Sequence, residues 1–113
     1  MTEKELKSLI DKTILPACKG VLYGKGRAYS GVRKAKDCLA NFKRGALLTG
    51  LKVEQVCFIY LAKHFDAIAS WTRGEYKDDT EGIESRIIDA INYLFLLYAI
   101  KIEKDKENKK EKM

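Results

Sequence analysis

The sequence contains a single histidine, a single proline and only three cysteines, and these scarcities exclude several classes of protein. His64 has no neighbouring motif of a catalytic triad, and no second histidine or cysteine lies at metal-ligand spacing. Cys18, Cys38 and Cys57 are odd in number and fall within helical patterns, so we expect reduced core thiols of a cytosolic protein. A serine or cysteine hydrolase and a metal-cluster protein are therefore not indicated.

We expect neither a membrane-spanning hydrophobic run nor a signal peptide. The apolar stretch from Ile87 to Ile100 is too short for a membrane span and contains Asp89 and Asn92. The N-terminus is polar, unlike a secretory signal. We therefore expect a cytoplasmic protein with no membrane partner.

Charge is abundant but only mildly biased. The net charge is +6 at neutral pH, and the lysine-rich segment after Glu103 contributes part of it. No stripe of basic residues is interleaved with aromatic ones. The excess favours anionic ligands in general and does not indicate nucleic acid as a partner.

Hydrophobic periodicity predicts four helices and no strands. Thr2 and Glu5 form a capping box that opens the first helix, and Pro16 should kink or split it. Its expected core face comprises Leu6, Leu9, Ile10, Ile14 and Val21. The other helices are expected at about residues 32–48, 53–71 and 80–101, with Gly50 and Gly74 marking the ends of two of them.

These patterns predict an all-α protein, a compact four-helix bundle that forms one domain over residues 1–103. Residues 104–113 form a charged C-terminal tail, expected as a frayed helix extension or as disorder. The last helix is apolar on more faces than three neighbours would cover. We therefore expect the chain to form a homo-oligomer through its C-terminal helix.

Within that last helix, Asp89 and Asn92 fall on one side together with Ser85 and Leu96. A carboxylate inside an apolar helix is costly unless it is paired. One interpretation is a buried pair of Asp89 with a lysine, arginine or histidine, and the other is contact with a ligand or cation.

His64 projects into the apolar face of the third helix, either as a hydrogen-bonded core residue or as a ligand contact. Lys63, at the edge of that face, either extends along the boundary or meets a phosphate. On the second helix, Asn41 lies with Asp37 and Arg44 on a face that is either solvated or part of a site.

The glycine-rich segment from Gly24 to Gly31 carries Lys25, Arg27 and Tyr29. Glycines let the backbone approach an anion, and the start of the following helix adds a favourable dipole. The spacing is not that of a phosphate-binding Gly-Lys-Ser/Thr loop, and no strand precedes it. A plain connecting loop is the alternative.

Four segments together resemble a small family of phage proteins, the nucleotide modification associated domains. Residues 25–30, 40–43, 62–68 and 86–94 match its Lys…Tyr-Ser loop, Asn-Phe helix, Lys-His helix and Asp-x-x-Asn-Tyr helix. The proteins of this family are similar in size and helical order to the all-α NTP pyrophosphatases of the MazG type. The resemblance covers about residues 20–100.

This resemblance implies an oligomeric, nucleotide-handling protein, located in the host cytoplasm if a phage encodes it. The matching positions are Lys25, Tyr29, Asn41, Lys63, His64, Asp89 and Asn92. We expect phosphate contacts from Lys63, Lys25 and Arg27. We expect His64, Asn41 and Asn92 to contact the base or the ribose, and Tyr29 to stack on the base. Asp89 is expected either to accept a hydrogen bond from a ribose hydroxyl or to orient His64.

The sequence departs from the pyrophosphatases at their magnesium ligands. Those enzymes carry Glu-x-x-Glu on one helix and Glu-x-x-Asp on the next, whereas here Glu81-x-x-Glu84 precedes Asp89 on the same helix. We therefore predict that the protein needs no cofactor. We predict that it binds or sequesters a nucleotide or a nucleotide-derived signal of host antiviral defence. The alternatives are a Mg²⁺-dependent pyrophosphatase that uses Asp37, Glu84 and Asp89, and a purely structural or regulatory oligomer.

Overall fold

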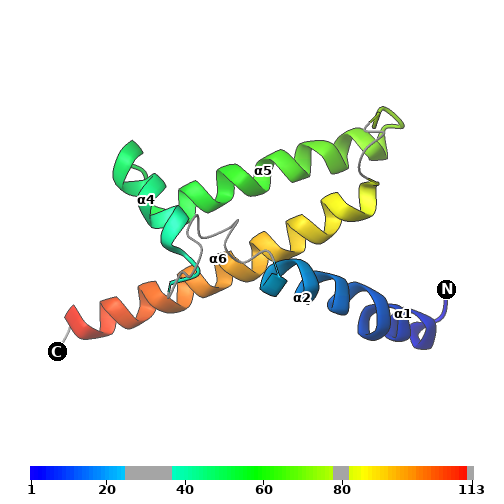
Figure 1. Cartoon of the computed structure of the whole chain (residues 1–113), viewed down its shortest axis with the longest axis horizontal. Coiled ribbons are helices and arrows are strands. Elements are labelled where there is room, and N and C mark those ends of the chain that lie inside the picture. The colour runs from blue at the N-terminus through cyan, green and yellow to red at the C-terminus, as the bar shows by residue number, and fades with distance from the viewer. Residues whose placement is uncertain (25–36, 78–81, 112–113) are drawn as a thin grey trace.

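The computed structural model describes residues 1–24, 37–77 and 82–111. Its helices are α1 (Glu3–Leu9), a π-helical turn η1 (Ile10–Ile14), α2 (Leu15–Gly24), α4 (Ala40–Thr49), α5 (Val53–Thr72) and α6 (Ile83–Glu111). These ranges contain no strand, and four helices pack together, so the predicted all-α class is confirmed. Helices α5 and α6 run antiparallel as the central pair (Figure 1).

The N-terminal helices α1 and α2 are joined without a break. The Thr2 side chain accepts a hydrogen bond from the Glu5 backbone N–H at 3.1 Å, as the capping pattern predicts. Pro16 does not split the helix, because the turn before it widens to η1 and Leu15 N–H donates to the carbonyl of Ile10. The expected core face is covered only in part, since Leu6 is exposed, Leu9, Ile10, Ile14 and Val21 are half-buried, and neither α1 nor η1 buries a residue fully.

Two glycines determine where α4 ends and how closely it packs on α5. Gly50 ends the helix in the left-handed region at φ 76°, and its N–H donates to the Ala46 carbonyl at 2.9 Å. At Gly45, an added Cβ would lie 2.9 Å from Val56 Cγ1 on α5. The missing side chain therefore allows α4 and α5 to approach closely.

The main core lies where α4, α5 and α6 meet. Its buried members are Leu39, Phe42, Val56, Cys57, Leu96 and Ile100. Helix α2 packs separately on α6, where its Cys18 is fully buried. On α5 the large side chains of Trp71 and Tyr60 remain exposed.

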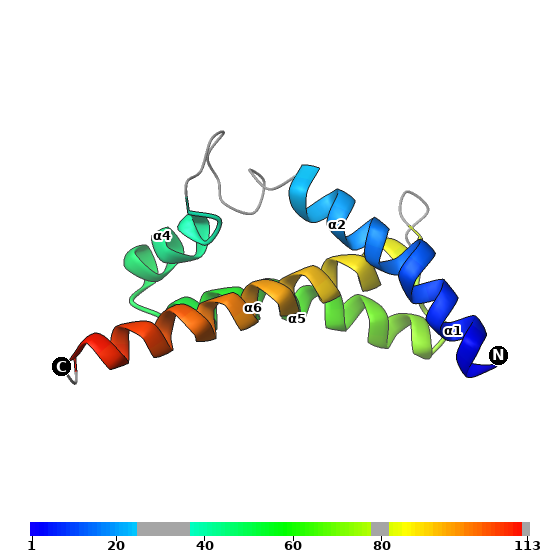
Figure 2. The same cartoon turned by 90° about the horizontal axis from the view of Figure 1, so that it is seen from below.

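The chain is elongated rather than compact, with extents of 50 × 31 × 27 Å and a radius of gyration of 16.3 Å. A compact chain of this length has a radius of gyration of about 13 Å. Helix α6 continues through the charged C-terminal segment to Glu111, so this segment is a helix extension. Helices α2 and α4 lie on the same side of the α5–α6 pair (Figure 2), and neither covers the other side.

Among the described helices, none alone is both long and apolar enough to cross a membrane, although α4 and α5, bent by 105°, pass that test as a pair.

Candidate functional site

The most distinctive part of the interior is an aromatic cluster that joins three helices. It consists of Phe42 on α4, Tyr60 and His64 on α5, and Tyr93 on α6. The His64 ring stacks on Tyr93 with centroids 5.4 Å apart, and Tyr60 stacks on the same ring at 6.1 Å. Phe42 meets Tyr60 and Tyr93 in tilted geometry at 5.9 and 6.2 Å. We call these four residues the aromatic cluster.

His64 is buried in this cluster, with 7% of its surface exposed. Its interior position agrees with the helical pattern, which predicted that it projects into the apolar face of this helix. Stacking fixes the imidazole plane against Tyr93, so the ring is held in one orientation. Tyr60 at the outer end of the stack is 43% exposed, so the cluster reaches the surface there.

Asn92, the neighbour of Tyr93 on α6, is completely buried. Its Nδ2 donates to the Cys18 carbonyl on α2 at 3.2 Å. Its Oδ1 is also buried, and no hydrogen-bond donor among the described residues reaches it. A buried carbonyl oxygen without a donor costs about 1–3 kcal/mol, so this atom calls for a partner.

The other predicted residues of α5 and α6 lie nearer the surface. Asp89, one turn before Asn92, is half-buried, and Ser85 before it is exposed. Burial therefore increases along this predicted polar stripe toward Asn92 and Leu96. Lys63 is exposed on α5 beside His64.

On α4, Asn41 is half-buried and its Oδ1 accepts a hydrogen bond from Arg44 Nη2 at 2.8 Å. Phe42, the next residue, is the member of the aromatic cluster that α4 contributes. The helix start thus positions Asn41 one residue from the cluster. Lys25, Arg27 and Tyr29 of the predicted anion loop lie outside the described residues.

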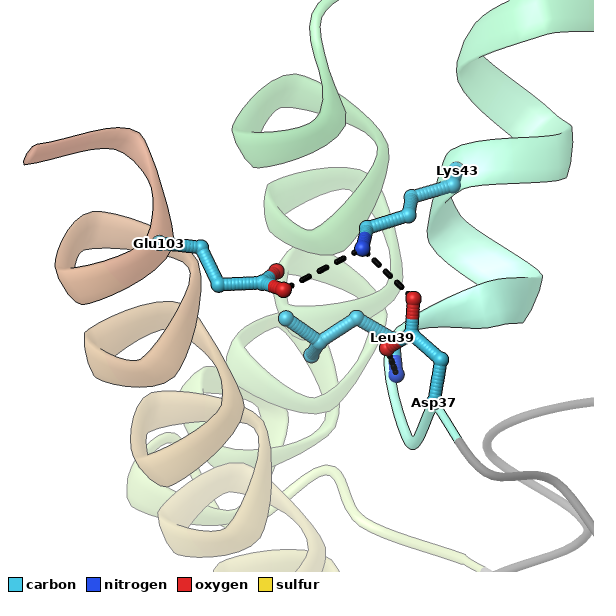
Figure 3. Close-up of polar contacts among 4 residues, drawn as sticks. All are labelled: Asp37, Leu39, Lys43 and Glu103. Atoms are coloured by element: carbon cyan, nitrogen blue, oxygen red, sulfur yellow. Dashed lines mark hydrogen bonds and ion pairs between the residues drawn. The ribbon is translucent and has the colours of Figure 1, made fainter. Parts of the chain in front are cut away.

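A second polar feature links α4 to the far end of α6. Lys43 Nζ lies 2.5 Å from Asp37 and 3.2 Å from Glu103 (Figure 3). The hydrogen bond from Lys43, and then that from the Leu39 backbone N–H at 2.9 Å, hold the pKa of Asp37 below its ordinary value. The bond to Asp37 in turn raises the pKa of Lys43. Lys43 therefore joins α4 to α6 through Glu103, and Asp37 is engaged in the same ion-pair network.

Beside this ion pair lies a groove of about 320 Å³ between α4, α5 and α6. It is lined by both signs of charge, including Lys43, Lys52, Glu54, Glu103 and Lys104. Lys104 also pairs with Glu54 across the groove. Glu54 and Lys104 lie 50 positions apart in the sequence, so no local pattern predicted this contact.

The cysteines fall into two kinds. Cys18 and Cys57 are buried, as predicted, and burial raises the pKa of the Cys57 thiol to about 11. Its Sγ donates to the Tyr93 carbonyl at 3.7 Å. Cys38 contradicts the prediction, because it lies in the turn before α4 and is exposed. A local helical pattern cannot distinguish a core position from a turn that precedes the helix.

Within residues 1–24, 37–77 and 82–111, no three histidine, cysteine or acidic side chains come together in a way that could hold a metal ion.

The fold and the site together define an all-α protein in which α4, α5 and α6 bring aromatic side chains, a buried histidine and a buried amide close together. No protein-family model, curated protein or solved structure matches the chain.

Proposed function

We propose that this protein binds a nucleotide or a nucleotide-derived small molecule beside the aromatic cluster and releases it unchanged. The observation that carries the proposal is Asn92, whose buried Oδ1 lies one residue from Tyr93 and lacks a donor among the described residues. Amino groups of nucleobases and hydroxyls of ribose are donors that satisfy such an oxygen. The aromatic cluster begins at the next residue, Tyr93, and an aromatic ring suits a planar base.

Positive charge near the aromatic cluster suits the phosphate end of such a ligand. Lys63 is exposed next to His64 on α5, and a flexible ammonium group binds phosphate as a point charge. Lys25 and Arg27 would add to it, and Tyr29 would stack on the base. Asn41 and Asp89, both half-buried, supply polar atoms for the ribose.

The biological setting follows from the resemblance to phage proteins. A phage protein in the host cytoplasm that holds a nucleotide signal without cleaving it would inhibit antiviral signalling by lowering the free concentration of that signal. Sequestration of this kind requires tight binding and no catalytic step, which agrees with the departure from the acidic pattern of the pyrophosphatases.

The oligomer belongs to the same proposal. One face of α6 presents apolar side chains that the described residues cover only in part: Leu94, Phe95, Tyr98 and Ile102 are exposed, and Ile87 and Ile91 are half-buried. They recur at helical spacing, and Tyr98 alone is 72% exposed. A second copy that packs its own α6 on this face would bury them, so we propose a homo-oligomer through the C-terminal helix.

Titration calorimetry with a panel of nucleoside monophosphates, triphosphates and cyclic dinucleotides tests the binding proposal. We expect one class of probe to bind, and Lys63→Ala to weaken its binding at least tenfold, about 1.4 kcal/mol. Lys4→Ala, which removes an exposed lysine on α1, should bind like the wild type.

The same samples separate the alternatives. Chromatography after incubation with Mg²⁺ should return the bound probe intact. Release of pyrophosphate would instead support the pyrophosphatase that uses Asp37, Glu84 and Asp89. If no probe binds, the structural or regulatory oligomer is the better account.

A further inference from the structure

Helix α5 carries a second apolar stripe that the sequence pattern did not single out. Phe58, Ala62, Phe65 and Ala69 follow at spacings of four, three and four residues, which places them on one face of the helix. Phe58 is 54% exposed and Phe65 is 43% exposed. This face lies about a quarter turn or more from the buried side of α5, which holds Cys57, Leu61 and His64.

The stripe is complementary to itself in the antiparallel direction. Its spacings read the same from either end, and it alternates a large side chain with a small one. When two copies of α5 pair antiparallel about a twofold axis, Phe58 faces Ala69 of the second copy and Phe65 faces Ala62. Each phenyl ring then fits over a methyl group, which is the knob-and-hole arrangement of packed helices.

The exposed area of the chain accommodates such a contact in addition to one on α6. The chain exposes 8603 Å², whereas a compact chain of 12.9 kDa exposes about 6300 Å². The difference, on the order of 2300 Å², is more than twice the roughly 800 Å² that each partner contributes to a standard interface.

We propose that α5 is a second docking surface for another copy of this chain, with α5 pairing antiparallel through Phe58, Ala62, Phe65 and Ala69. The apolar face of α6 points away from α5, so the two contacts use different surfaces. Where the two twofold axes cross at right angles, two such contacts on one chain close into an assembly of four chains. This inference is independent of the ligand, and its failure would leave the binding proposal intact.

Light scattering during size-exclusion chromatography tests it first. Phe58→Asp should reduce the wild-type mass by half while leaving the α6 contact in place, because a charge replaces the ring at the paired face. Ile59→Asp is the matched control, since Ile59 is 57% exposed on the same helix but lies about 100° around it. A wild-type mass for Phe58→Asp, or a halved mass for Ile59→Asp, would overturn the proposal.

A compensating exchange of side chains tests the register of the antiparallel α5 pair without adding charge. It also tests the pairing if Phe58→Asp lowers the helix content of the protein. Phe58→Ala leaves a gap and Ala69→Phe creates a clash, so each should weaken the assembly about tenfold or more. The double variant F58A/A69F exchanges large and small at the same facing pair and should restore wild-type assembly. If the double variant is as weak as the single ones combined, the antiparallel pairing is wrong.

Discussion

Asn92 is a buried polar side chain whose hydrogen bonds the fold satisfies only in part. It is fully buried, one end of its amide is bonded to the Cys18 carbonyl, and the other end has no donor among the described residues. Helical periodicity alone identified it, and His64, as polar groups facing inward. The aromatic cluster around them was not predicted, because Phe42, Tyr60 and Tyr93 lie on three helices and meet only in the tertiary structure.

The cysteines give a prediction at the same scale. Thiolate is the reactive form, and burial keeps the Cys57 thiol protonated up to a pKa of about 11, while Cys38 is exposed. At pH 8, a chromogenic thiol reagent should therefore modify Cys38 rapidly and leave Cys18 and Cys57 unmodified. Denatured protein should react at all three positions, and Cys38→Ser should abolish the rapid phase in the folded protein. Rapid modification of Cys57 in folded protein would show that its burial is wrong.

The helix ends that caps and glycines mark are the boundaries that local sequence predicted best, whereas the helix expected from about residue 32 was wrong at its start, because residues 37–39 form a turn and α4 begins at Ala40. The Thr2 cap and the terminating glycines Gly50 and Gly74 are confirmed, because each depends on a few neighbouring atoms. The outcome at Pro16 was only partly predictable, since a lost hydrogen bond can be accommodated by a break, a kink or a π turn. The second apolar face of α5 was missed because Phe58 and Phe65 lie off the face that the pattern assigned to the core.

The close approach of α4 to α5 predicts how two glycine-to-alanine substitutions change stability. Gly45→Ala should lower the free energy of unfolding, because the new Cβ would lie 2.9 Å from Val56 Cγ1. Gly20→Ala is the control, since a Cβ there meets nothing within 4 Å and alanine favours a helix over glycine by about 0.5–1 kcal/mol. Thermal unfolding should thus show opposite shifts in Tm for the two variants. Equal stabilisation by both would contradict the close packing at Gly45.

At the scale of the whole molecule, the elongated shape and the uncovered apolar faces have one physical cause. Two long helices that are apolar on most sides cannot be enclosed by the short helices of a single chain. The excess hydrophobicity of the last helix was visible in the sequence, whereas the open shape depends on how the helices are arranged (Figure 1). The proposed assembly of several copies would cover these faces.

The central claim is that this protein holds an intact nucleotide-type molecule beside the aromatic cluster. The most direct measurement is mass spectrometry of the small molecules that heat-denatured protein releases after purified protein has been exposed to a lysate of infected cells. We predict that wild-type protein and Lys4→Ala release an unmodified nucleotide-derived compound, and that Lys63→Ala releases far less of it. No nucleotide from the wild type, or equal amounts from Lys63→Ala, would contradict the claim.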